Sequence, residues 1–113
     1  YIYNLIDNEI NGYGPISELL EDPEITEIMV NGKNEIYIEL NGQIIKDESI
    51  SFINDDHIIR TIGRMIQPIG RTIDTANPMV DARLSDGSRL NAVIPPLSLK
   101  GPVLTIRKFK KEI

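Results

Sequence analysis

Apolar residues recur at helical spacing in three stretches of the chain. Two of these stretches are short, 2–10 (IYNLIDNEI) and 16–22 (ISELLED). The third, 54–67, is apolar along one side, with Asn54 or Ser51 as its N-cap and two Asp in its first turn, where the helix dipole favours negative charge. We therefore predict two short helices followed by one longer amphipathic helix.

Short runs of alternating or β-branched apolar residues predict five or six strands. The second and third runs flank Asn41-Gly42, which predicts a type I′ hairpin, because both central residues of that turn have positive φ. Helices and strands do not alternate regularly, so the predicted fold class is α+β, with a mainly antiparallel sheet and helices packed against it. The runs are 24–30, 35–40, 43–48, 79–85, 89–95 and 103–109.

The segment 81–96, DARLSDGSRLNAVIPP, predicts a hairpin whose register follows from its apolar positions. A two-residue loop would send the apolar side chains of its two strands to opposite faces of the sheet. An odd loop, such as 85–87 with Gly87 in the left-handed conformation, pairs Ala82 with Leu90 and brings both apolar sets to one face. The same register gathers four polar residues on the other face, namely Asp81, Arg83, Arg89 and Asn91.

This polar face sets Arg83 next to Arg89 across the hairpin. Like charges directly opposite one another are unfavourable by up to about 1 kcal/mol. The pair is tolerated when it is solvated or when Asp81 offsets it, and it is favoured when an anion lies between the two guanidinium groups. The spacing leaves both interpretations open, a solvated sheet surface or a site for an anion.

Charge is distributed unevenly along the chain. Residues 1–56 hold 13 acidic and 2 basic side chains, whereas residues 57–113 hold 4 acidic and 10 basic ones, including all six arginines. The split indicates either a solvated surface of segregated charge or a cationic face for an anion. Arg60 and Arg64 lie one turn apart on the polar face of the longer predicted helix, and we expect them to be solvated.

The residue types present exclude several kinds of site. Without Cys, neither a disulfide nor a thiolate metal site can form, and a single His makes a His-based metal site unfavourable. We expect that residue, His57, at the surface or at its boundary. The sequence contains no P-loop, nucleophile or metal-ligand motif, and no apolar run reaches the roughly 18 to 20 residues of a membrane-spanning helix. The pattern is typical of a module that contributes cations to a site completed elsewhere.

Four segments of the sequence carry a family resemblance, namely EIMVNG (27–32), IYIELNGQI (36–44), 68–96 and GPVLTIRKF (101–109). Together they resemble the N-terminal domain of type II/IV secretion ATPases, in particular the CpaF-like ATPases of tight-adherence pilus systems. The resemblance implies a PAS-like α+β domain over 14–109. Residues 1–13 would then be the link from a preceding region, and 110–113 the start of a linker to a RecA-like ATPase domain.

The resemblance also implies a function. Full-length members are cytoplasmic homo-hexamers at the inner face of the membrane, which use ATP and Mg²⁺ to drive pilus assembly or protein secretion with inner-membrane platform proteins. Nucleotide lies between the two domains, and arginines of the N-terminal domain reach its phosphates. The matching candidates here are Arg89 and Arg107, with Arg83 as a third, because the guanidinium fork suits phosphate oxygens. Without Walker motifs, we expect no catalytic residue, no bound metal and no hydrolysis from this chain alone.

Two other functions remain as alternatives. A stand-alone PAS-like sensor or protein-interaction module would bind a small ligand or a partner through its sheet. Nucleic-acid binding through the basic second half is disfavoured, because the chain has only four Tyr and two Phe and lacks the stacking motif of an RNA-binding sheet.

Overall fold

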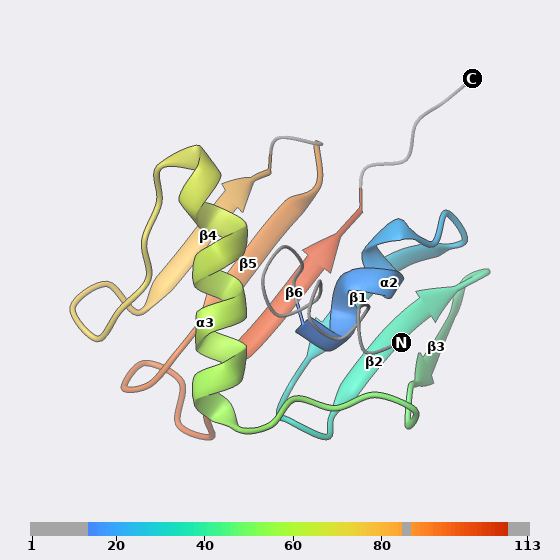
Figure 1. Ribbon diagram of the computed structural model, residues 1–113, viewed down its shortest axis with the longest axis horizontal. Coiled ribbons are helices and arrows are strands. Elements are labelled where there is room, and N and C mark those ends of the chain that lie inside the picture. Colours follow the sequence, from blue (N-terminus) through green and yellow to red (C-terminus); the bar gives the residue numbers. More distant parts are fainter. Residues whose placement is uncertain (1–13, 85–86, 109–113) are drawn as a thin grey trace, which may run out of the picture.

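The strands form one antiparallel sheet in the order β3-β2-β1-β6-β5-β4 (Figure 1). This computed structural model describes residues 14–84 and 87–108. All five neighbouring pairs of strands are antiparallel, so the predicted sheet of five or six strands is confirmed. The strands are β1 (Ile25–Val30), β2 (Ile36–Leu40), β3 (Gln43–Lys46), β4 (Met79–Arg83), β5 (Arg89–Val93) and β6 (Val103–Arg107).

The described helices lie on one face of this sheet, with α3 across β4 and β5 and α2 near β1 (Figure 1). The predicted α+β class, with helices packed against an antiparallel sheet, is therefore confirmed. The short helix predicted over 16–22 and the longer one over 54–67 are both present, whereas the helix predicted over 2–10 lies outside the described residues. The helices are η1 (Gly14–Ile16), α2 (Ser17–Glu21), α3 (Asp55–Ile66) and η2 (Gln67–Ile69).

The core lies between α3 and the sheet. Ile58, Ile62 and Ile66 follow one side of α3 and are completely buried. From the sheet, Ile28, Leu90 and Ile106 lie in one row across β1, β5 and β6, and they are also completely buried. Burying a side chain of this size stabilises the fold by about 1.5 to 3 kcal/mol, so this interface determines which face of the sheet α3 covers.

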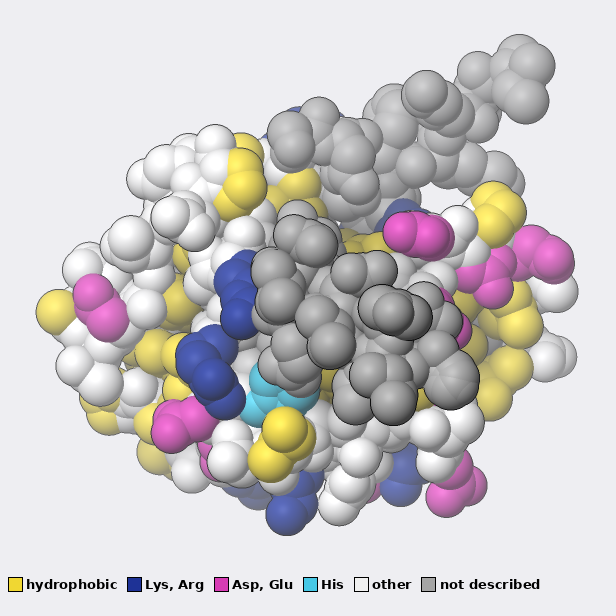
Figure 2. All heavy atoms as spheres, in the orientation of Figure 1, with side chains coloured by type: hydrophobic (Ala, Val, Ile, Leu, Met, Phe, Trp, Pro, Cys, Tyr) yellow, Lys and Arg dark blue, Asp and Glu magenta, His cyan; other side chains and the backbone are white. Residues whose placement is uncertain are grey.

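The polar side of α3 faces away from the core. Figure 2 shows the helix-covered face, on which Lys and Arg side chains gather over α3. Arg60 and Arg64 are both exposed, as predicted.

Strand β1 contains a β-bulge that the sequence pattern did not predict. The pairing with β2 passes from Ile25 opposite Leu40 to Glu27 opposite Glu39, so Thr26 is the extra residue. The Thr26 hydroxyl donates to the backbone carbonyl and the side chain of Glu39, at 3.3 and 3.1 Å. The bulge explains how Ile25 and Ile28 can both be buried although three positions separate them.

The predicted hairpin turn between β2 and β3 is confirmed by its backbone. Asn41 has a φ of 54° and Gly42 a φ of 81°, the two positive values that a type I′ turn requires. Asn and Gly adopt this left-handed region at lower cost than other residues.

The start of α3 confirms one expectation and overturns another. Asn54 is the N-cap, because its side-chain oxygen accepts the backbone N–H of His57 at 2.9 Å. The expectation of a surface or boundary position for His57 was wrong, because the residue is only 7% exposed. Its Nδ1 accepts the backbone N–H of Ile53 at 3.1 Å, and its ring meets that of Phe52 edge-on at 5.1 Å. His57 thus helps to anchor the segment that leads into the helix.

Candidate functional site

The register of the hairpin β4–β5 is the one that the apolar positions predicted. Ala82 lies opposite Leu90 and Asp81 opposite Asn91, which leaves Arg83 opposite Arg89. At the end of the hairpin, the backbone N–H of Leu84 donates to the carbonyl of Ser88 at 2.7 Å, and Gly87 has a φ of 94°. An odd loop over 85–87 is confirmed by this pairing, although residues 85 and 86 themselves lie outside the described part of the chain.

Strand β6 extends the polar row beyond this hairpin. Arg107 lies opposite Arg89 on one side and opposite Glu27 of β1 on the other. We call the face of the sheet that the described helices leave uncovered the open face. Four charged residues follow one line across this face, from β4 through β5 and β6 to β1, namely Arg83, Arg89, Arg107 and Glu27. The sequence pattern placed Arg83 beside Arg89, but only the pairing of β5 with β6 brings Arg107 next to Arg89.

A shallow hollow lies along this row. Its volume is about 240 Å³. Arg89 and Arg107, the two arginines favoured by the family resemblance, both line it, whereas Arg83 does not; instead, Nη1 of Arg83 donates to the carbonyl of Gly87 at 3.4 Å. We call this feature the arginine hollow; the residues that line it are Glu27, Asp81, Arg89, Asn91, Thr105 and Arg107.

Each arginine of the hollow has a carboxylate beside it. The guanidinium of Arg89 donates two hydrogen bonds to the Asp81 carboxylate, from Nε to Oδ1 at 3.1 Å and from Nη2 to Oδ2 at 3.0 Å. Arg107 is held more loosely, with its Nε 3.8 Å from Oε1 of Glu27. The hydrogen bonds from Arg89 hold the pKa of the Asp81 carboxyl below its usual range and raise the pKa of the guanidinium in turn.

The lining of the arginine hollow suits an anion with several oxygens. Two guanidinium groups, the amide of Asn91 and the hydroxyl of Thr105 offer N–H and O–H donors from adjacent strands. The arginine side chains are 64% and 77% exposed, so a ligand can reach them from solvent. Among the described residues, no group of three or more His, Cys, Asp or Glu could hold a metal ion. The described helices also include none that is long and apolar enough to cross a membrane.

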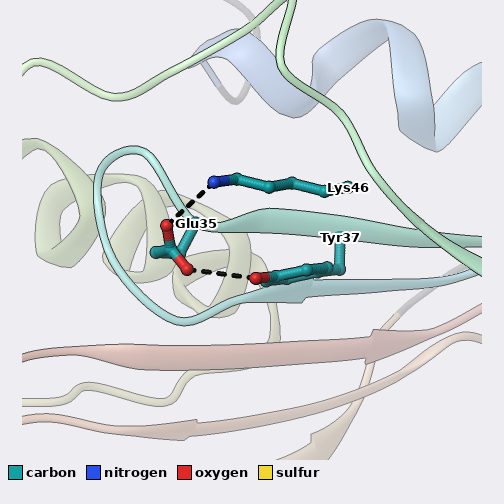
Figure 3. Close-up of polar contacts among 3 residues, drawn as sticks. All are labelled: Glu35, Tyr37 and Lys46. Atoms are coloured by element: carbon teal, nitrogen blue, oxygen red, sulfur yellow. Dashed lines mark hydrogen bonds and ion pairs between the residues drawn. The ribbon is translucent and has the colours of Figure 1, made fainter.

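A second polar cluster joins β2 and β3 (Figure 3). Glu35 accepts from Nζ of Lys46 at 3.1 Å and from the hydroxyl of Tyr37 at 3.0 Å. The hydrogen bond from Lys46, followed by that from Tyr37, lowers the pKa of Glu35, and Glu35 raises the pKa of both partners. We call these three residues the hairpin cluster. No sequence motif indicated it, although the turn at Asn41-Gly42 implies that Tyr37 and Lys46 lie opposite one another.

The fold and the sequence of this chain are similar to those of known proteins. The model of the type II/IV secretion system protein family matches residues 9–113. A crystal structure of the VirB11 ATPase from the Brucella suis type IV secretion system, in complex with sulphate, superposes with a TM-score of 0.67 at 26% identity, over 84% of this chain and 28% of that one.

Curated relatives are similar in sequence over most of this chain. The type IV secretion system protein VirB11 of Brucella suis is 28% identical over 95 residues, which are 83% of this chain and 26% of the relative. The uncharacterized protein MJ0781 of Methanocaldococcus jannaschii is 34% identical over 102 residues, 90% of this chain and 14% of the relative. The chain thus spans less than a third of each of these proteins. The match over residues 9–113 shows that the chain belongs to the type II/IV secretion system protein family.

Proposed function

We propose that this chain is the nucleotide-sensing N-terminal domain of an ATPase that powers pilus assembly or protein secretion, and that Arg89 and Arg107 contact the phosphates of ATP. The observation that supports the proposal is the adjacency of these two arginines in one hollow on the open face of the sheet. In this role, residues 14–109 form the domain, 1–13 link it to a preceding region and 110–113 begin the linker to a RecA-like ATPase domain.

The chemistry of the arginine hollow supports a contact with phosphate. A guanidinium group can bind two phosphate oxygens at once and keeps its charge at any physiological pH. Two of them on adjacent strands can share the charge of a polyphosphate, as arginine fingers do in other nucleotide hydrolases. Arg83 has a lesser part in the proposal, because its side chain bonds the carbonyl of Gly87 and does not line the hollow.

The rest of the proposal concerns the full-length protein. ATP and Mg²⁺ are held mainly by the RecA-like domain, the open face of the present domain covers the phosphates, and movement of one domain against the other accompanies hydrolysis. The protein works as a homo-hexamer at the cytoplasmic face of the membrane, in contact with platform proteins of a pilus or secretion system. Within the family, membership of the CpaF-like branch is proposed on the resemblance of the sequence.

The test is mutation of either arginine in the full-length protein. Arg89→Ala or Arg107→Ala should lower the ATPase rate at least about tenfold, since charge-stabilising arginines contribute to the transition state of phosphoryl transfer. Arg60→Ala is the matched control, because it removes an exposed arginine from α3 on the opposite side of the sheet. Circular dichroism checks that each variant is folded. Unchanged turnover in both site variants would contradict the assignment.

A further inference from the structure

The arginine hollow is already neutral before any ligand arrives. It is lined by two arginines and two carboxylates, so its formal charges cancel. An anion that enters the hollow therefore meets negative charge as well as positive charge. Each carboxylate competes with the anion for its arginine, and it competes more strongly the better its own ion pair is formed.

The two ion pairs differ in geometry. Asp81 takes two hydrogen bonds from Arg89, both near 3 Å, which is the bidentate arrangement that a guanidinium also offers to phosphate. Glu27 has one approach to Arg107 at 3.8 Å, beyond hydrogen-bonding distance. Arg107 is also the more exposed arginine, at 77% against 64% for Arg89. Arg107 can therefore turn to a ligand at little cost, whereas Arg89 must give up Asp81 before it can offer the same edge of its guanidinium to a ligand.

We propose that Asp81 is a latch that competes with phosphate for Arg89, and so weakens the binding of nucleotide until both arginines are engaged. This inference rests on the proposed function of the hollow. Arg107 makes the first contact, and Arg89 exchanges Asp81 for phosphate oxygens afterwards. Even where a phosphate uses only the free edge of the guanidinium, the Asp81 carboxylate on the other edge repels it. Asp81 is thus a positioning residue that acts through Arg89.

The latch predicts a gain of affinity, which damage to the fold would not produce. In the full-length protein, Asp81→Asn should lower the Kd for a non-hydrolysable ATP analogue about two- to fivefold, the range expected of an exposed ion pair. Calorimetric titration measures the Kd, and thermal unfolding checks the fold. Asp81→Ser, which is also uncharged, serves as a second variant if Asp81→Asn unfolds. Glu48→Gln is the control, because it makes the same change of net charge at an exposed residue outside the hollow.

A double-mutant cycle shows whether Asp81 acts through Arg89. In the Arg89→Ala background, Asp81→Asn should lose most of its effect on the Kd. A Kd that rises or stays the same in Asp81→Asn, or a gain of equal size in the Arg89→Ala background, would overturn the latch. The single variant Arg89→Ala separates the two proposals. If it leaves the Kd unchanged, the nucleotide site itself is wrong; if it raises the Kd while Asp81→Asn does not lower it, only the latch is wrong.

Discussion

The open face of the sheet carries two polar clusters that combine the same kinds of groups in different ways. In the hairpin cluster, Glu35 meets one ammonium and one hydroxyl, so each neighbour stabilises its negative charge (Figure 3). In the arginine hollow, Arg89 lies beside Arg107 on the next strand, and each cation needs a carboxylate of its own. Adjacent like charges do not stabilise a sheet. The first arrangement is therefore that of a structural ion pair, whereas the second agrees with the anion site that we propose.

The largest difference between the two clusters should appear in catalysis. In the full-length protein, Arg89→Lys should reduce the ATPase rate on the order of tenfold, because lysine keeps the charge but cannot form the planar fork. Lys46→Arg, the reverse exchange in the hairpin cluster, should leave the rate unchanged. Steady-state ATPase assays compare the two variants. An equal loss of ATPase rate in both variants would contradict a functional difference between the arginine hollow and the hairpin cluster.

The turn of the hairpin β2–β3, which carries the hairpin cluster, should contribute to the stability of the fold. Gly42→Ala should lower the free energy of unfolding by about 1 kcal/mol, because Gly42 has a φ of 81°, a conformation that costs a residue with a Cβ about that much. Urea denaturation measures the loss. Gly63→Ala is a suitable control, since Gly63 lies within α3 with open space around the added Cβ, and alanine favours helix. A loss of equal size in Gly63→Ala would show that the turn conformation is not the cause.

The smallest effect is a shared dependence of stability on pH. Asp81 and Glu35 both have a pKa below the usual range in the folded protein, caused first by hydrogen bonds from Arg89 and Lys46 respectively. The stability that these pairs contribute is therefore present above the unfolded pKa of about 4 and is lost as the pH falls through the folded pKa. Asp81→Asn and Glu35→Gln should each flatten the fall of Tm between about pH 5 and pH 2 slightly.

Thermal melts across that pH range provide the measurement. Because both pairs are exposed, each change in slope should be small, and high salt should reduce it. A Tm profile of Asp81→Asn that runs parallel to that of the unmodified protein would remove Asp81–Arg89 from the pairs that stabilise the fold.

Much of the fold could be predicted because the relevant signals are local. The turn at Asn41-Gly42 needs only two residues that tolerate positive φ, and the N-cap of α3 needs only Asn54 in front of an amphipathic stretch. The register of β4–β5 followed from requiring one apolar face, which placed Arg83 opposite Arg89. The prediction for His57 was wrong because its burial depends on contacts with the ring of Phe52 and the backbone of Ile53. The spacing of apolar residues along the chain does not indicate such contacts.

By itself, the sequence determined which residues of β4 and β5 share a face of the sheet, because side chains alternate along a regular strand. It did not determine which strands are neighbours. The position of β6 between β1 and β5 was decided by the tertiary structure, where the row of Ile28, Ile106 and Leu90 is buried under the helices. That long-range packing brings Arg107 beside Arg89 and Glu27, and so builds a hollow from residues that are far apart in the chain.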